Sequence, residues 1–151
     1  MKLKQLYAPV ALNTGEKGQL EAVSVYPDGH KKYFFRPGGL NKTTGKRLEA
    51  FDVMERDIDG AMADYQDYPP DIFEKDVEEI NSGLKGKVIK LVYFMGGCVH
   101  AIIQPPGTKA DGERKEPENI DMRSLKGEAI RELTPEEKAA APISPVSDWL
   151  G

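Results

Sequence analysis

Cys98 and His100 are the residues whose types could support nucleophilic catalysis, and with His30 they are the soft metal ligands of this chain. A catalytic cysteine needs a base within hydrogen-bonding reach and an electropositive, partly exposed setting. Cys98 instead lies in an apolar run, where a free cysteine is usually a small buried hydrophobe. No spacing joins the three residues into a transition-metal site. The sequence therefore predicts a protein that is not an enzyme, with no catalytic residue, no metal ligand and no cofactor.

The segment from Gly38 to Arg47, GGLNKTTGKR, superficially resembles a phosphate-binding loop. In that motif four residues separate the glycines, and Ser or Thr follows the lysine. Here Gly39 and Gly45 enclose five residues, and Arg47 follows Lys46. The spacing excludes an NTPase but leaves open a looser contact with the phosphates of a nucleic acid.

Basic residues with interleaved aromatic residues gather between residues 31 and 47. Sheet proteins that bind single strands place cations on phosphates and aromatic rings under bases. Alternation along a strand puts Tyr33 and Phe35 on one face, where both could equally pack in the core. The candidate nucleic-acid contacts are Lys31, Lys32, Arg36, Lys42, Lys46 and Arg47.

Charge is distributed unevenly along the 151 residues, whose formal net charge is −4. Residues 1–48 hold nine basic and three acidic residues, 49–83 hold two and twelve, and 84–151 hold ten of each. The acidic segment could be a solvated surface, or it could mimic a phosphate backbone and inhibit a nucleic-acid-binding protein. It could also pair with the basic segment of a neighbouring subunit, which would steer assembly.

The element that must organise the fold is the apolar run at 87–104, which Gly96 and Gly97 interrupt. A two-residue turn at these glycines predicts a hairpin in which Met95 faces Cys98. Both faces of this hairpin are largely apolar, so we expect it to be covered on both sides or to form a subunit interface. The turn-forming run of residues 27–30, Pro-Asp-Gly-His, predicts a second hairpin at about 19–36.

Apolar residues between the hairpins recur at helical spacing, which predicts helices at about 51–65 and 71–82. Gly60 weakens the first of these helices by about 1 kcal/mol. The expected fold is α+β, with a mostly antiparallel sheet from the two hairpins, the two helices and an extended C-terminal arm. No internal repeat is visible.

Residues 1–106 are expected to form a single α+β domain, and residues 107–151 a C-terminal arm. Thr134, Pro135 and Glu137 match a capping box, which predicts a short helix near 134–141. Residues 120–133 fit either a weak hairpin or a helical segment. The arm ends in an extended, proline-containing segment whose apolar anchors for a partner are Ile143, Val146, Trp149 and Leu150.

These patterns favour a non-enzymatic structural or assembly protein, an oligomer or a subunit of a larger complex such as a viral or phage particle. Charge complementarity and the C-terminal arm would stabilise the protein–protein interactions of this complex. The alternatives are a small nucleic-acid-binding module and an acidic inhibitor that mimics nucleic acid. The expected partners are proteins. The single cysteine and the lack of a secretory signal favour an intracellular compartment, and the lack of an apolar run near the roughly 20 residues of a membrane span favours no membrane. The expected location is the cytoplasm, or a virion assembled in one.

Overall fold

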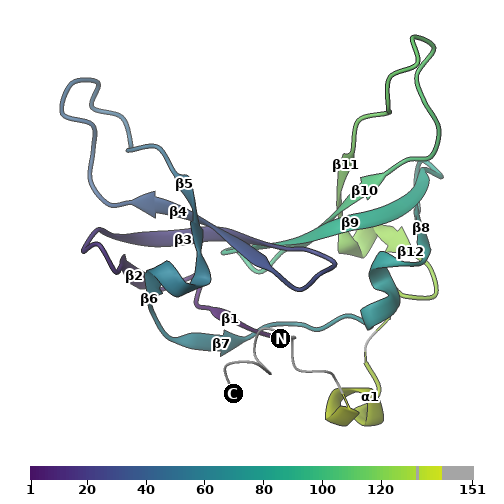
Figure 1. Cartoon of the computed structure of the whole chain (residues 1–151), viewed down its shortest axis with the longest axis horizontal. Helices are drawn as coiled ribbons and strands as arrows, with labels where there is room; N and C mark the ends of the chain where they lie inside the picture. Colours follow the sequence, from purple (N-terminus) through teal and green to yellow (C-terminus); the bar gives the residue numbers. More distant parts are fainter. Residues whose placement is uncertain (132, 141–151) are drawn as a thin grey trace. The chain divides into compact units, whose positions relative to one another are not determined.

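The computed structural model describes residues 1–131 and 133–140 and is built mostly of antiparallel β-strands (Figure 1). Strands account for 46% of the chain and helical turns for 10%. The α helix α1 (Pro135–Ala140) begins with a capping box, since the Thr134 N–H donates to Glu137 and the Glu137 N–H donates back to the Thr134 hydroxyl. Because strands predominate and α1 has only six residues, the predicted α+β class with two helices is wrong.

Neither predicted long helix is present. The segment 51–65 contains the strands β5 (Phe51–Met54), β6 (Ile58–Asp59) and β7 (Met62–Asp64), with the 3₁₀ turn η1 (Glu55–Asp57) between β5 and β6. Val53 and Ile58 are buried there, whereas Phe51 and Met54 of the predicted apolar stripe are each 39% exposed. Pairing with other strands has overridden the helical spacing, since short apolar patterns fit either structure.

The second predicted helix, at 71–82, is replaced by the 3₁₀ turn η2 (Pro70–Phe73) and the strand β8 (Asp76–Glu79). Ile72 and Val77 are each 1% exposed, but Ile80 is 54% exposed, so the apolar residues do not form one buried stripe. The residues between η2 and β8 are polar and exposed.

The chain divides into two compact units, each assembled from separate stretches. Unit 1 contains residues 1–25, 31–66 and 92–99, and unit 2 contains residues 26–30, 67–91 and the described residues from 100 onward. The predicted C-terminal arm thus contributes to unit 2. Its strands there are β11 (Glu118–Asp121) and β12 (Leu125–Lys126), which the 3₁₀ turn η3 (Met122–Ser124) joins.

Unit 1 holds a five-stranded antiparallel meander in the order β5-β4-β3-β2-β6. Its remaining strands are β2 (Pro9–Leu12), β3 (Lys17–Val25) and β4 (Lys31–Pro37), and the last two form the predicted first hairpin. A separate two-stranded pair joins β1 (Lys2–Lys4) to β7. In chain order, the first strand of the meander is β2 and the last is β6, and these two strands pair with each other.

Unit 2 holds a meander of the same order, β11-β10-β9-β8-β12. Its central hairpin is formed by β9 (Lys85–Phe94) and β10 (Val99–Gln104), although the tip of this hairpin belongs to unit 1. In chain order, the 3₁₀ turn η3 connects the fourth strand, β11, to the fifth, β12, and β12 pairs with the first strand, β8. The strands of unit 1 follow the same plan.

The two meanders also share their strand registers, which defines repeat 1 (9–59) and repeat 2 (76–126). Val10 lies opposite Gly18 in repeat 1, and Val77 lies opposite Gly86 in repeat 2. Leu12 pairs with Ile58 in repeat 1, and Glu79 pairs with Leu125 at the equivalent place in repeat 2. Tyr33 pairs with Val53 in repeat 1, and Ala101 pairs with Ile120 in repeat 2. The chain is an internal duplication, although the sequence analysis found no repeat.

The clearest sequence trace of the duplication is the turn between the first two strands of each repeat. It reads NTGEKG at 13–18 and NSGLKG at 81–86. The Leu12 N–H donates to the Glu16 carbonyl across the first turn, and the Glu79 N–H donates to the Leu84 carbonyl across the second. The second turn is one residue longer, because four residues separate Leu12 from Lys17 and five separate Glu79 from Lys85.

The tips of the two central hairpins have the same geometry. The Gly97 N–H donates to the Phe94 carbonyl, and the Phe94 N–H donates to the Cys98 carbonyl at 2.9 Å. Gly97 has a φ of 92°, as expected for the left-handed residue of a three-residue hairpin turn. Tyr26, Gly29 and His30 make the equivalent bonds. The predicted pairing of Met95 with Cys98 is therefore wrong by one residue.

Candidate functional site

The predicted basic set lies partly on β4 and partly on arm 1, which is the loop of residues 38–50 between β4 and β5 (Figure 1). An isolated bridge pairs Leu40 with Arg47 across the arm. The Asn41 side chain accepts the backbone N–H groups of Thr43 and Thr44 at the arm's tip. Arm 1 is therefore a narrow hairpin, held by turn chemistry rather than by a core.

Arg36 anchors the base of arm 1. Its Nε lies 2.9 Å from Glu21 Oε1, and one terminal nitrogen donates to the Leu48 carbonyl at 2.7 Å. Arg47 lies on the other oxygen of Glu21, 3.6 Å away. Two of the predicted nucleic-acid contacts therefore share one carboxylate, and Arg36 serves a structural purpose.

Two further cations of the set have carboxylate neighbours, one in η1 and one on β5. Lys31 lies 3.7 Å from Glu55, and Lys32 lies 4.0 Å from Asp52. By contrast, no ion pair to Lys42 or Lys46 is found among the described residues, and both side chains are exposed. The structure thus leaves two lysines of the predicted six facing solvent without a carboxylate partner.

Ion pairs also connect the basic N-terminal segment to the acidic middle segment within unit 1. Lys2 pairs with Asp64 at 3.0 Å, in addition to the pairs of Lys31 and Lys32. Part of the charge asymmetry seen in the sequence is therefore compensated inside one molecule. Charge complementarity between molecules, if present, must use other residues.

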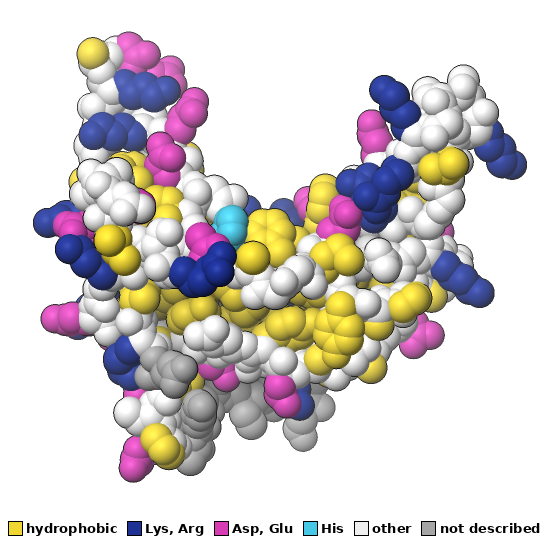
Figure 2. All heavy atoms as spheres, turned by 180° about the vertical axis from the view of Figure 1, so that it is seen from behind, with side chains coloured by type: hydrophobic (Ala, Val, Ile, Leu, Met, Phe, Trp, Pro, Cys, Tyr) yellow, Lys and Arg dark blue, Asp and Glu magenta, His cyan; other side chains and the backbone are white. Residues whose placement is uncertain are grey.

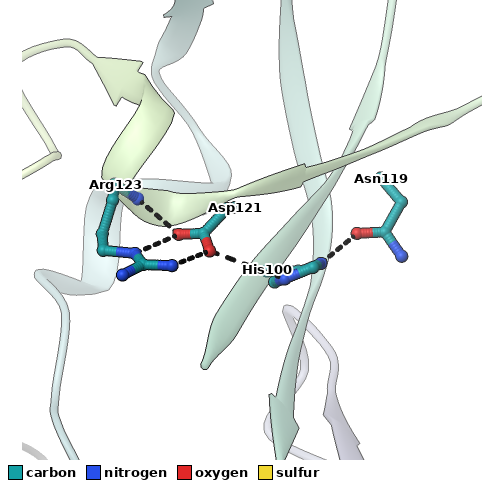
Figure 3. A network of polar contacts seen from close by, with 4 residues as sticks. All are labelled: His100, Asn119, Asp121 and Arg123. Atoms are coloured by element: carbon teal, nitrogen blue, oxygen red, sulfur yellow. Dashed lines mark hydrogen bonds and ion pairs between the residues drawn. The ribbon is translucent and has the colours of Figure 1, made fainter. Parts of the chain in front are cut away.

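Cys98 and His100, the first candidates for chemistry, have different surroundings. Cys98 is exposed at the hairpin tip, so the prediction that it is a buried hydrophobe is wrong. His100 on β10 takes part in a polar network with Asn119, Asp121 and Arg123 (Figure 3). Its Nδ1 lies 2.6 Å from Asn119 Oδ1, and its Nε2 lies 3.7 Å from Asp121 Oδ2.

Asp121 is the centre of this network because it also holds Arg123. The carboxylate accepts the Arg123 Nε at 3.1 Å, a terminal nitrogen at 2.9 Å and the backbone N–H at 2.8 Å. Hydrogen bonds from the Arg123 guanidinium and backbone lower the pKa of the Asp121 carboxyl to about 2. Asn119 and Asp121 thus contact the two ring nitrogens of His100 and fix the orientation of its ring (Figure 3).

An open groove lies beside β11 in unit 2. Its volume is about 820 Å³, and it is lined by β11, Glu79, Ser124 and the turn residues 81–84. Sequence reasoning did not find this site, because its lining comes from two segments more than thirty residues apart. The run Asn119-Ile120-Asp121, polar on one face of a short strand, is the local signal that was available.

Large apolar side chains are exposed on the edge of the meander in unit 1. Phe34 on β4 and Phe51 and Met54 on β5 are each 39% exposed, and Leu40 on arm 1 is 60% exposed. Figure 2 shows hydrophobic side chains exposed among the charged ones on the face turned to the reader. The four predicted anchors of the C-terminal arm, Ile143, Val146, Trp149 and Leu150, lie outside the described residues.

The described residues are 1–131 and 133–140. No group of three or more His, Cys, Asp and Glu residues in these ranges could hold a metal ion. In the same ranges, no helix has the length and hydrophobicity required to cross a membrane.

The fold defines a tandem duplication of a small five-stranded β-meander. Comparison of the chain with protein-family models, curated proteins and solved structures gives no match.

Proposed function

We propose that this protein is a non-enzymatic assembly protein that associates with protein partners, including copies of itself, as a subunit of a larger complex. The observation that supports this most is the apolar free edge of unit 1. Among the described residues, β5 pairs with β4 alone, so half of its backbone groups face away from the sheet. An exposed strand edge that also carries large apolar side chains is a ready site for association.

Phe34 and Met54 form a small patch at this edge, whereas Phe51, which pairs with Phe35, lies on the opposite face of the sheet. Phe34 lies opposite Asp52 on β5, and Met54 lies opposite Lys32, so Phe34 and Met54 are diagonal neighbours on one face. Phe51 packs edge-on against the buried Phe35, with ring centroids 5.6 Å apart. Burying Phe34 and Met54 at an interface would stabilise it by about 1.5–3 kcal/mol for each fully covered side chain.

Sedimentation velocity of the full chain over rising concentration tests the proposal. We expect the wild type to form oligomers, and the double variant Phe34→Ser/Met54→Ser to require at least about tenfold higher concentration, since each lost contact removes 1 kcal/mol or more. Met62→Ser is the matched control, because Met62 is 41% exposed on β7, outside the patch. A monomer at every concentration that also captures no protein partner would contradict the proposed function.

A nucleic-acid-binding module is the second candidate, and the two exposed lysines of arm 1 support it. It predicts salt-sensitive binding of a labelled single strand that weakens when Lys42 and Lys46 become Gln. The carboxylates beside Lys31, Lys32, Arg36 and Arg47 argue against a wider basic surface. No retention of labelled RNA or DNA at low salt would exclude this candidate.

A further inference from the structure

The groove along β11 has the features of a docking site for an extended segment. Within the described chain β11 pairs with β10 alone, and alternate residues of an antiparallel edge strand direct both backbone groups outward. The turn of residues 81–84 forms the opposite wall, and it contains the extra residue of repeat 2. An added strand could therefore hydrogen-bond to the edge of β11 while its side chains contact the groove.

The lining of the groove is acidic, with a small apolar component. Glu79, Glu118 and Asp121 contribute carboxylates, and no Lys, Arg or His lies among the lining residues. Asp121 is held by Arg123, and Glu79 accepts hydrogen bonds from Ser82, which lower the pKa of the Glu79 carboxyl. Glu118 is exposed and has no ion pair among the described residues, so its charge is available to a partner.

The corresponding edge in repeat 1 has the opposite character, which argues that the acidic groove is a specialised feature of repeat 2. The shared register places Phe51 at the position of Glu118, and Met54 at the position of Asp121. Two positions that hold exposed apolar side chains in repeat 1 therefore hold carboxylates in repeat 2. The two edges consequently suit different partners.

Arm 1 is the segment of this chain whose chemistry complements the groove. Its exposed Lys42 and Lys46 have no carboxylate partner in the described part of the chain, and Leu40 is 60% exposed. These residues match the carboxylates of the groove and its apolar residues Leu84 and Ile120. The narrow hairpin projects beyond the meander of its own unit, so it can reach a second molecule (Figure 1).

We propose that arm 1 of one copy docks into the β11 groove of a second copy, with Lys42 and Lys46 facing Glu118 and Asp121. This inference rests on the proposed function, because it specifies one contact of the assembly. It is a heterologous contact, since the arm and the groove are different surfaces. Such a contact builds rings or chains of subunits rather than simple dimers.

Charge reversal tests the contact in the full-length protein by sedimentation velocity. We expect Glu118→Lys to weaken association about tenfold, and Lys42→Glu/Lys46→Glu to do the same, because each replaces attraction by repulsion. An equimolar mixture of the two variants should recover the wild-type association. In the mixture each reversed surface finds a partner surface of opposite charge.

Two variants control for folding and for net charge. Asp59→Lys makes the same change of charge as Glu118→Lys, also on an exposed residue. The equivalent position of repeat 2 already holds Lys126, so the fold accepts a lysine there. This variant should leave association unchanged. Glu118→Gln removes the charge without a cation and should weaken association by less than Glu118→Lys. Circular dichroism checks that each variant is folded.

The outcomes separate this inference from the proposed function. If the wild type associates, but Glu118→Lys associates equally well or the mixture fails to recover, the contact between arm and groove is wrong and the assembly proposal stands. If the wild type remains a monomer at every concentration, self-assembly is wrong and this contact is wrong with it.

Discussion

Gly18 and Gly86 occupy the same position in two copies of one strand pair, where the second strand of each repeat crosses the end of the third. A Cβ atom on Gly18 would lie 2.1 Å from the Arg36 carbonyl oxygen, and one on Gly86 would lie 2.4 Å from the Gln104 carbonyl oxygen. Both are backbone atoms, which cannot move aside as a flexible side chain can. The same close approach of two backbones is therefore built into both repeats.

Gly86→Ala is expected to destabilise the protein by about 1–3 kcal/mol, the usual range for overpacking a fixed site. Gly18→Ala should do the same in repeat 1. Urea denaturation followed by circular dichroism measures the change in the free energy of unfolding. Gly96→Ala is the matched control, because nothing lies within 4 Å of its added Cβ. Equal stability of the Gly86 and Gly96 variants would contradict the close approach.

Tyr33→Phe is expected to cost about 1–3 kcal/mol of stability, because it leaves buried polar groups without partners. The buried Tyr33 hydroxyl donates to Glu55 Oε1 at 2.6 Å and accepts the Lys4 N–H at 2.9 Å. Tyr7→Phe is the control, since Tyr7 is 61% exposed. Thermal unfolding monitored by circular dichroism should show a lower midpoint for Tyr33→Phe alone.

The same tyrosine predicts a loss of stability in base. Burial, followed by the hydrogen bond to Glu55, raises the pKa of Tyr33 well above its usual value. A raised folded-state pKa means that this contribution is complete below the unfolded pKa of about 10 and is lost as the pH rises above it. Spectrophotometric titration should find one tyrosine that ionises only when the protein unfolds. Ionisation of every tyrosine in the folded protein near pH 10 would refute this.

Asp121 predicts a loss of stability in acid. Its pKa is lowered to about 2 by Arg123, so its contribution is present above the unfolded value of about 3.9 and is lost as the pH falls toward 2. We expect the thermal midpoint of Asp121→Asn to fall less than that of the wild type between pH 5 and about pH 2. Parallel curves for the two proteins would show that Asp121 carries none of this dependence.

Arg36→Gln is expected to loosen arm 1, because it removes the bonds to Glu21 and to the Leu48 carbonyl. Hydrogen exchange measured by mass spectrometry should become faster for peptides covering residues 38–50. Lys32→Gln is the control, since Lys32 pairs at 4.0 Å with Asp52, which lies on β5 and outside the arm. If both variants exchange at the wild-type rate, Arg36 does not hold the arm.

Local turn chemistry made part of the fold predictable from the sequence. Pro27, Asp28 and Gly29 located the first hairpin, and Gly97 adopts the positive φ that a hairpin tip requires. The two helices were predicted wrongly because strands of two to four residues carry too few positions to distinguish strand from helix spacing. Their partners lie far away in the sequence, where local patterns hold no information.

The duplication was missed because the two repeats fill their cores differently. Tyr33 and Phe35 in repeat 1 correspond to Ala101 and Ile103 in repeat 2, and all four are fully buried. The volume lost at one position must be supplied by other side chains, so residue identities are not retained. The register of backbone pairing is retained instead, and the clearest trace of it in the sequence is the pair of turns NTGEKG and NSGLKG.

The candidate site was predictable only in composition. The basic residues between 31 and 47 stood out, but their pairing with Glu21, Asp52 and Glu55 depends on which strands lie side by side. The groove on β11 depends in the same way on the approach of a distant turn.

Each repeat encodes one hairpin tip that belongs to the unit of the other repeat. Residues 26–30 belong to unit 2 and residues 92–99 to unit 1, where the Met95 N–H donates to the Glu21 carbonyl. A cut at residue 66 would deprive each half of a piece that the other half encodes. Residue 66 therefore lies between the two repeats but does not separate the two units.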